Sequence, residues 1–272
     1  MTVPASHPCI VVGIDGSRAA IDAALWAVDE AVVRDIPLRL LYAIEPGDFA
    51  QTPPDRPARK LAIAENAVRY ASVTTEAAGK PVRIEIEIAQ QPPIIALTRA
   101  SASAAMVCVG AVGLHHFRAE RAGSTAAAVA QSAHCPVAVI RRHGDRAGRD
   151  EHWLAVDPQA AADSDAVMKT ALDEARLRGL PLRAISHGQR VGCDYPDRRL
   201  ERWRRRYPDV DLQTTESRGS LVEYLAGHGR QLRMVVVGHR NQDAVRQLLG
   251  PAGNAVLHNA DCSLLIVDRP NL

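Results

Sequence analysis

The strongest constraint in this sequence is that its second half repeats its first. Five segments of the first half recur in the second half, in the same order and with related residues. The pairs are residues 11–15 (VVGID) with 153–157 (WLAVD), 27–31 (AVDEA) with 171–175 (ALDEA), 36–39 (IPLR) with 180–183 (LPLR), 106–110 (MVCVG) with 234–238 (MVVVG), and 135–140 (CPVAVI) with 262–267 (CSLLIV). Five matches in one order indicate an internal duplication, so the fold is one that this chain builds twice.

The first half reads as strands alternating with helices. Residues 9–17 are an apolar run that ends in Gly, Asp, Gly and Ser, which is typical of a buried strand stopping at a turn. Ser17 can cap a helix that ends near residues 35–37, because Pro37 cannot continue it. Further strands are predicted at residues 38–44, 82–89, 105–109 and 136–141, and further helices at about 59–78, 93–100 and 124–132. This alternation predicts a mostly parallel sheet with right-handed crossovers.

The polar, charged residues 142–151 (RHGDRAGRDE) separate the two halves and are expected to form a linker. We therefore expect two doubly wound, Rossmann-like α/β domains, residues 1–143 and 151–272, each with a five-stranded parallel sheet flanked by helices. A chain of 272 residues is long enough for two such domains. Because 47% of the residues are hydrophobic but only 4% are aromatic, both cores must be aliphatic, which suits strands covered on both faces.

Charge and cysteine content exclude several classes of protein. A net charge of +2 is too balanced to predict nucleic acid or an anionic membrane as a partner. The five cysteines are an odd, scattered set without metal-ligand spacing, which argues against a disulfide framework and for the reducing cytoplasm. The N-terminal residues do not read as a signal peptide, and no apolar stretch is long enough for a transmembrane helix.

The clearest candidate site follows the predicted fourth strand. The chain carries no standard P-loop, Gly-x-Gly-x-x-Gly, Gly-x-Ser-x-Gly or His-Glu-x-x-His motif. It does carry Gly110 and Gly113, then nine residues, then Gly123 and Ser124 at a helix start. Ligands of open α/β sheets lie at the carboxyl ends of the strands, where glycines let backbone N–H groups approach an anion and a helix N-terminus attracts phosphate. The strand ends at residues 13–15 and 109–110 are predicted to flank this crevice, with hydroxyl donors from Ser124 and Thr125.

The pattern Gly-x2-Gly-x9-Gly-Ser, together with VVGIDGS at residues 11–17, resembles the nucleotide-binding class of universal stress proteins. The resemblance covers nearly the whole chain as a tandem pair. It implies ATP, with its triphosphate over the turn at residues 110–113 and the helix start at residues 123–124, and with Mg²⁺ held through the phosphates. It also implies that Asp15 lies near the adenosine and that Ala43 lines the adenine pocket. The complete predicted site comprises Gly13, Asp15, Ala43, Val109, Gly110, Gly113, Gly123, Ser124 and Thr125.

The resemblance implies an ATP-binding stress-response or regulatory protein whose output is a change of conformation or partner binding. No catalytic residue is assigned. Weak ATP hydrolysis stays open, and would need His115, His116 or Arg118 to position a water beside the phosphates. A protein-interaction scaffold that binds no nucleotide is the third hypothesis.

The second half departs from the motif. Asp157 and Gly238 are kept, but Asn241 stands in the place of Gly113 and Pro251 in the place of Ser124. Proline removes a backbone N–H and the hydroxyl together, so we predict that the second domain binds ATP poorly or not at all. The last strands, residues 136–141 and 263–267, are apolar, and the resemblance predicts that they pair the two domains or support a homodimer.

Three other features have ordinary structural explanations. His115 and His116 are adjacent and lack a carboxylate cluster, so no metal site is assigned. The arginines at residues 198–199 and 202–206 surround Trp203 and could bind nucleic acid, but the balanced charge favours a solvated helix face with Leu200 and Trp203 turned inward. Three cysteines are expected to be small buried core residues rather than redox sites: Cys108, Cys135 and Cys262.

Overall fold

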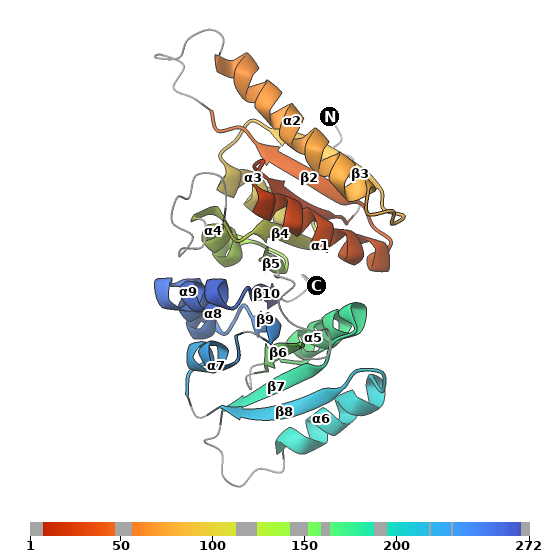
Figure 1. Cartoon of the computed structure of the whole chain (residues 1–272), viewed down its shortest axis with the longest axis vertical. Helices are drawn as coiled ribbons and strands as arrows, with labels where there is room; N and C mark the ends of the chain where they lie inside the picture. The colour runs from red at the N-terminus through yellow and green to blue at the C-terminus, as the bar shows by residue number, and fades with distance from the viewer. Residues whose placement is uncertain are drawn as a thin grey trace. The chain divides into compact units, whose positions relative to one another are not determined.

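The protein is described by a computed structural model, which covers residues 8–46, 56–112, 124–141, 152–158, 164–187, 195–217, 219–229 and 231–267 (Figure 1). The chain divides into two compact units, unit 1 up to residue 142 and unit 2 from residue 143 to residue 269. Each unit is an α/β layer structure in its own right, so the two are described separately.

Unit 1 alternates strands and helices along the chain. Its elements are β1 (Ile10–Ile14), α1 (Arg18–Arg34), β2 (Leu38–Ala43), α2 (Arg56–Glu76), β3 (Ile84–Ala89), α3 (Pro93–Ser101), β4 (Met106–Gly110), α4 (Ser124–Ser132) and β5 (Val137–Ile140). The strands lie in the order β3-β2-β1-β4-β5, and every pair is parallel. Helices α1 and α2 pack together on one face of this sheet and α3 and α4 on the other (Figure 1).

The first helix of unit 1 shows how the local sequence sets element ends. The Ser17 side chain accepts a hydrogen bond from the Ala20 amide, as predicted for an N-cap. At the other end, Asp35 adopts the left-handed conformation with φ of 51° and ends α1 before Pro37. The corresponding residue after the first helix of unit 2 is Gly179, with φ of 62°.

Unit 2 repeats the architecture, with two helices described between its last two strands. Its elements are β6 (Trp153–Asp157), α5 (Ser164–Arg178), β7 (Leu182–His187), α6 (Tyr195–Arg206), β8 (Leu212–Ser217), α7 (Leu221–His228), β9 (Leu232–Gly238), α8 (Gln242–Leu249), α9 (Pro251–Asn259) and β10 (Ser263–Val267). The strand order is β10-β9-β6-β7-β8, again parallel throughout. Helices α5 and α6 cover one face of the sheet, and α7, α8 and α9 cover the other (Figure 1).

Among the described residues the core of unit 1 is aliphatic, as the composition predicts, whereas the core of unit 2 also buries Trp153, Trp203, Tyr207 and Tyr224. The central strands β1 and β4 are buried along nearly their whole length, and so are β6 and β9. Each unit also contains, at the same place of the repeat, an ion pair whose carboxylate is buried. Glu30 of α1 pairs with Arg34, and Glu174 of α5 pairs with Arg178 at 2.9 Å; both carboxylate side chains are at most 1% exposed.

The predicted fold class is confirmed, and the elements predicted for the first half differ from the observed ones only at their ends. The helix expected at about residues 59–78 is α2, residues 56–76, and the strand expected from residue 82 begins as β3 at Ile84. The start of β3 matches that of its neighbour, because Leu38, the first residue of β2, pairs with Ile84. Within the described ranges, no helix combines the length and the apolar character needed to cross a membrane.

Candidate functional site

The candidate site lies at the carboxyl ends of β1, β2 and β4 in unit 1. β1 is the central strand and pairs with β2 on one side and with β4 on the other. The chain fills the β2 side first and then crosses to β4, so the order of strands reverses between β1 and β4. Open α/β sheets bind ligands at such a reversal point, because the loops of neighbouring strands diverge there.

The turn after β1 fixes the position of Asp15. The Asp15 Oδ1 atom accepts a hydrogen bond from the Ser17 amide at 2.8 Å, and Ser17 in turn caps α1. Gly16, between them, has φ of 86°, a conformation that side chains with a Cβ rarely adopt. The Asp15 side chain is half-buried, so the Asp-Gly-Ser turn presents a carboxylate at the reversal point.

Tyr42 is a residue of this site that the sequence reasoning missed. Burial raises the pKa of the Tyr42 phenol, and the negative charge of Asp15 raises it further. Tyr42 pairs with Ile14 in the ladder and directly precedes Ala43, the half-exposed last residue of β2. An aromatic residue one position before the predicted adenine contact, in a chain with few aromatics, is the signal that could have identified it.

The glycines of this region have a packing role that the motif alone does not reveal. A Cβ on Gly110 would come within 2.5 Å of the Ala19 backbone in the first turn of α1. A Cβ on Gly13 would lie 3.2 Å from the Leu97 side chain and 3.4 Å from that of Val109. Val109 itself is buried, and its side chain packs beside Gly13. Both glycines therefore let helices approach the strand ends closely, in addition to any contact with a ligand.

The structure describes only some of the remaining motif residues. Ser124 is the first residue of α4, and its side chain lies outside the described residues, whereas Thr125 is half-buried in the same first turn. The N-terminus of α4 presents backbone N–H groups that its own helix does not use. The other predicted residues of this segment lie outside the described residues: Gly113, His115, His116, Arg118 and Gly123.

At the equivalent strand ends of unit 2, the side chain of Asn241 contacts the aspartate. Asp157, the counterpart of Asp15, is 2% exposed. The Asn241 Nδ2 atom donates a hydrogen bond to Asp157 Oδ2 at 3.2 Å, and Asn241 Oδ1 caps α8 by accepting from the Ala244 amide. Gly250 caps α9, and Pro251 occupies its first turn. The Asn241 amide thus contacts the carboxylate of Asp157, whereas the equivalent carboxylate of Asp15 in unit 1 is half-exposed.

The described residues contain no group of three or more His, Cys, Asp or Glu side chains arranged to hold a metal ion. The three cysteines expected to be core residues, Cys108, Cys135 and Cys262, are all buried.

Comparison with known proteins identifies the family. The model of the universal stress protein family matches residues 9–141, which include the whole candidate site. A universal stress protein of Mycobacterium tuberculosis is 53% identical over 272 residues, covering 97% of this chain and 98% of the relative. The chain belongs to the universal stress protein family. Because that relative matches along its full length, membership extends to both units.

Two further matches agree with this assignment. A second universal stress protein of Mycobacterium tuberculosis is 40% identical over 264 residues and covers 96% of each chain. The crystal structure of a universal stress protein from Archaeoglobus fulgidus aligns with a TM-score of 0.74 and 16% identity over 97% of each chain, which shows that the fold is shared.

Proposed function

We propose that this universal stress protein binds ATP in unit 1 and uses the occupancy of that site to change its conformation or its partners. The observation that carries the proposal is the half-exposed carboxylate of Asp15 beside Tyr42 at the point where the strand order reverses. An acidic side chain there can accept hydrogen bonds from ribose hydroxyls, and the N-terminus of α4 follows the adjacent strand β4. Mg²⁺ would accompany the phosphates rather than bind a cage of protein ligands.

The same proposal makes the protein asymmetric. In unit 2 the carboxylate of Asp157 is buried and contacts Asn241, and Pro251 supplies no N–H at the first turn of α9. We therefore propose that residues 151–272 form a second domain that keeps the fold of residues 1–143 but does not bind ATP. The resemblance also predicts domain pairing or a homodimer through the apolar last strands and a cytoplasmic location, and these remain predictions.

The test is to release and identify small molecules from the freshly purified full chain by mass spectrometry, and to titrate ATP with Mg²⁺ by calorimetry. We expect about one ATP per chain, since Asp15 is half-exposed whereas Asp157 is buried and contacts Asn241. Asp15→Asn should weaken binding about tenfold or more, because hydrogen bonds to a charged acceptor are stronger than neutral ones. Asp157→Asn is the matched control in unit 2 and should leave the affinity within about twofold.

Two outcomes would contradict the proposal. If the protein retains no adenine nucleotide and gives no binding heat with Mg²⁺, a protein-interaction scaffold takes its place. If Asp157→Asn weakens binding as much as Asp15→Asn, the asymmetry is wrong. Gly123→Val is a further variant of the predicted phosphate contact, and it should lose affinity while the protein stays folded.

A further inference from the structure

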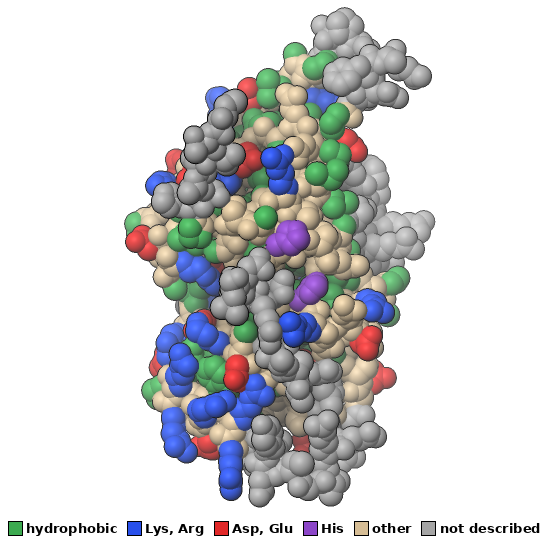
Figure 2. All heavy atoms as spheres, turned by 180° about the vertical axis from the view of Figure 1, so that it is seen from behind, with side chains coloured by type: hydrophobic (Ala, Val, Ile, Leu, Met, Phe, Trp, Pro, Cys, Tyr) green, Lys and Arg blue, Asp and Glu red, His purple; other side chains and the backbone are tan. Residues whose placement is uncertain are grey.

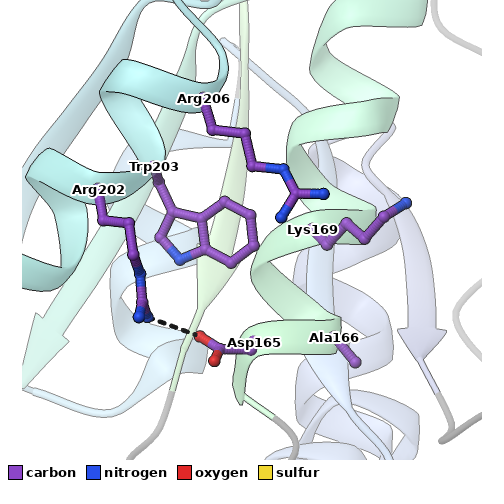
Figure 3. A pocket seen from close by; sticks show the side chains of 6 residues that line it. All are labelled: Asp165, Ala166, Lys169, Arg202, Trp203 and Arg206. Carbon is purple, nitrogen blue, oxygen red and sulfur yellow. Dashed lines mark ion pairs between the residues drawn. The ribbon is translucent and has the colours of Figure 1, made fainter.

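A hollow in unit 2 lies between helices α5 and α6, and neither Asp157 nor Asn241 lines it. Its volume is about 380 Å³, and its lining residues are Asp165, Ala166, Lys169, Arg202, Trp203 and Arg206 (Figure 3). The first three residues come from the N-terminal half of α5 and the last three from the C-terminal half of α6. A hollow of this size accommodates a small molecule rather than a segment of a macromolecule.

The charge of this hollow is unbalanced. Among the described residues that line it, Lys169, Arg202 and Arg206 are cationic and Asp165 is anionic. That carboxylate is already engaged by Arg199 at 2.7 Å and by Arg202 at 3.6 Å. The positive charge that lines the hollow therefore exceeds what Asp165 can neutralise.

Arg206 and Lys169 both line the hollow, and they differ in their ion pairs (Figure 3). Lys169 pairs with Asp173 at 2.7 Å along α5. Among the described residues Arg206 has no ion-pair partner, and its guanidinium lies 5.8 Å from the centre of the Trp203 ring. A planar guanidinium in this situation is suited to two parallel hydrogen bonds to a phosphate group.

Trp203 supplies a second, independent indication of a ligand. Its side chain is 5% exposed, and its indole Nε1 is buried without a hydrogen-bond partner among the described residues. Figure 3 shows this nitrogen on the ring edge that faces Arg202 and Asp165 at the hollow. A buried N–H group without an acceptor costs free energy. A ligand oxygen at this edge would accept the hydrogen bond that no described residue accepts.

The competing explanation is an ordinary solvated face of basic residues. Lys and Arg side chains do gather in the region where Figure 1 draws α6 (Figure 2, lower left). Arg198 and Arg205 fit that explanation, because they are exposed and do not line the hollow. Arg202 and Arg206 differ, because both line the hollow together with Lys169. Binding of nucleic acid by base stacking is disfavoured, since the Trp203 ring is buried.

From these observations we propose that the hollow between α5 and α6 is an anion site that binds a small phosphate-bearing molecule. Arg206, Arg202 and Lys169 hold its phosphate oxygens, and the Trp203 indole N–H donates to one of them. The site belongs to unit 2 and does not depend on ATP binding in unit 1.

The indole N–H groups allow a direct test in the full-length protein. The chain has three tryptophans, so a ¹H–¹⁵N spectrum contains three indole resonances, and Trp203→Phe identifies the one at the hollow. Inorganic pyrophosphate, titrated at low salt, should shift the Trp203 resonance to saturation. The resonances of Trp26 and Trp153 should stay in place, since neither residue lines the hollow.

Charge-matched variants separate the site from the general basic surface. Arg206→Gln and Arg202→Gln should each weaken pyrophosphate binding about tenfold or more, as expected for loss of a charge-assisted contact. Arg205→Gln removes the same charge from an exposed position of α6 and should change the affinity by less than about twofold. Unchanged Trp26 and Trp153 resonances in each variant would show that the fold is intact.

Three results would overturn the proposal. The first is the absence of a saturable shift of the Trp203 resonance. The second is an equal loss of affinity in Arg205→Gln, which would assign the effect to the general charge of α6. The third is a shift produced by a single-stranded oligonucleotide but not by pyrophosphate, which would make the surface a nucleic-acid contact.

Discussion

The carboxyl ends of β1 and β6 carry equivalent aspartates in different surroundings. In unit 1, Asp15 is half-buried and accepts from the Ser17 amide in its own turn. In unit 2, Asp157 is 2% exposed and accepts from the side chain of Asn241 on the far side of the crevice. The replacement of a motif glycine by asparagine thus does more than add bulk. It provides the carboxylate with an amide of the same protein.

A second pair of aspartates differs in the same way. Asp29 of α1 pairs with Lys80, an exposed residue that follows α2. Its counterpart Asp173 of α5 accepts a hydrogen bond of 2.8 Å from the buried Tyr207, which follows α6. Duplication preserved the acidic residue and the helix that carries it, while each unit acquired its own partner. The two units therefore share a scaffold and differ in the contacts at its edges.

The largest expected effect concerns the ion pair that the two units share. Arg34→Met and Arg178→Met each deprive a fully buried carboxylate, Glu30 or Glu174, of its guanidinium. We expect the free energy of unfolding of the affected unit to fall by about 3 to 5 kcal/mol. Urea unfolding followed by the indole ¹H–¹⁵N resonances of Trp26 in α1 and Trp153 in β6 reports on each unit.

Arg83→Met is the control for this pair of variants. It breaks a mostly exposed ion pair with Glu85 and should cost less than about 1 kcal/mol. A loss that is large in one unit and below about 1 kcal/mol in the other would show that the duplicated ion pair no longer has the same role in both.

The second prediction concerns the residue that distinguishes the two crevices. Asn241→Ala removes the hydrogen bond to Asp157 and the N-cap of α8 together. The free energy of unfolding of unit 2 should fall by about 1 to 2 kcal/mol, as for loss of a good N-cap. Asn259→Ala, at an exposed position near the end of α9, should change it by less than about 0.5 kcal/mol. Equal effects of the two variants, measured by urea unfolding, would mean that Asn241 does not hold this corner together.

The smallest expected effect concerns Tyr207, the partner of Asp173 in unit 2. Burial and the hydrogen bond to Asp173 raise the pKa of Tyr207 to about 12. The protonated phenol is therefore the form that the fold stabilises. This contribution is complete below the ordinary tyrosine pKa of about 10, and it is lost as pH rises towards the folded value.

Tyr207→Phe should cost about 1 kcal/mol at neutral pH, and its difference from the parent protein should shrink between about pH 10 and pH 12. Unfolding midpoints across that range measure the effect, because the other ionisations cancel in the difference. Tyr70→Phe, at an exposed position of α2, is the control and should show no such trend. A difference independent of pH would contradict the assigned role of the Tyr207 hydroxyl.

Much of the fold could be predicted because it depends on signals close together in the chain. The cap at Ser17, the stop before Pro37 and the apolar runs of β1 and β4 each follow from a few adjacent residues. The inward positions of Leu200 and Trp203 likewise follow from helical spacing, and both side chains are buried as predicted. Element ends were less predictable, as β3 shows, because the start of a strand depends on its neighbour in the ladder.

The sequence by itself determined the duplication, the α/β layers and the strand ends that carry the aspartates. Repeats, hydrophobic period and turn residues are local properties, and they are the same wherever the chain later packs. Only the tertiary structure decided that Ala19 fills the space beside Gly110, that Tyr42 lies by Asp15, and that Asn241 contacts Asp157 across 84 residues. The same holds for the hollow between α5 and α6. The reason is physical, since each of these contacts joins groups on different elements, and their distance is fixed by packing of the whole sheet rather than by any local pattern.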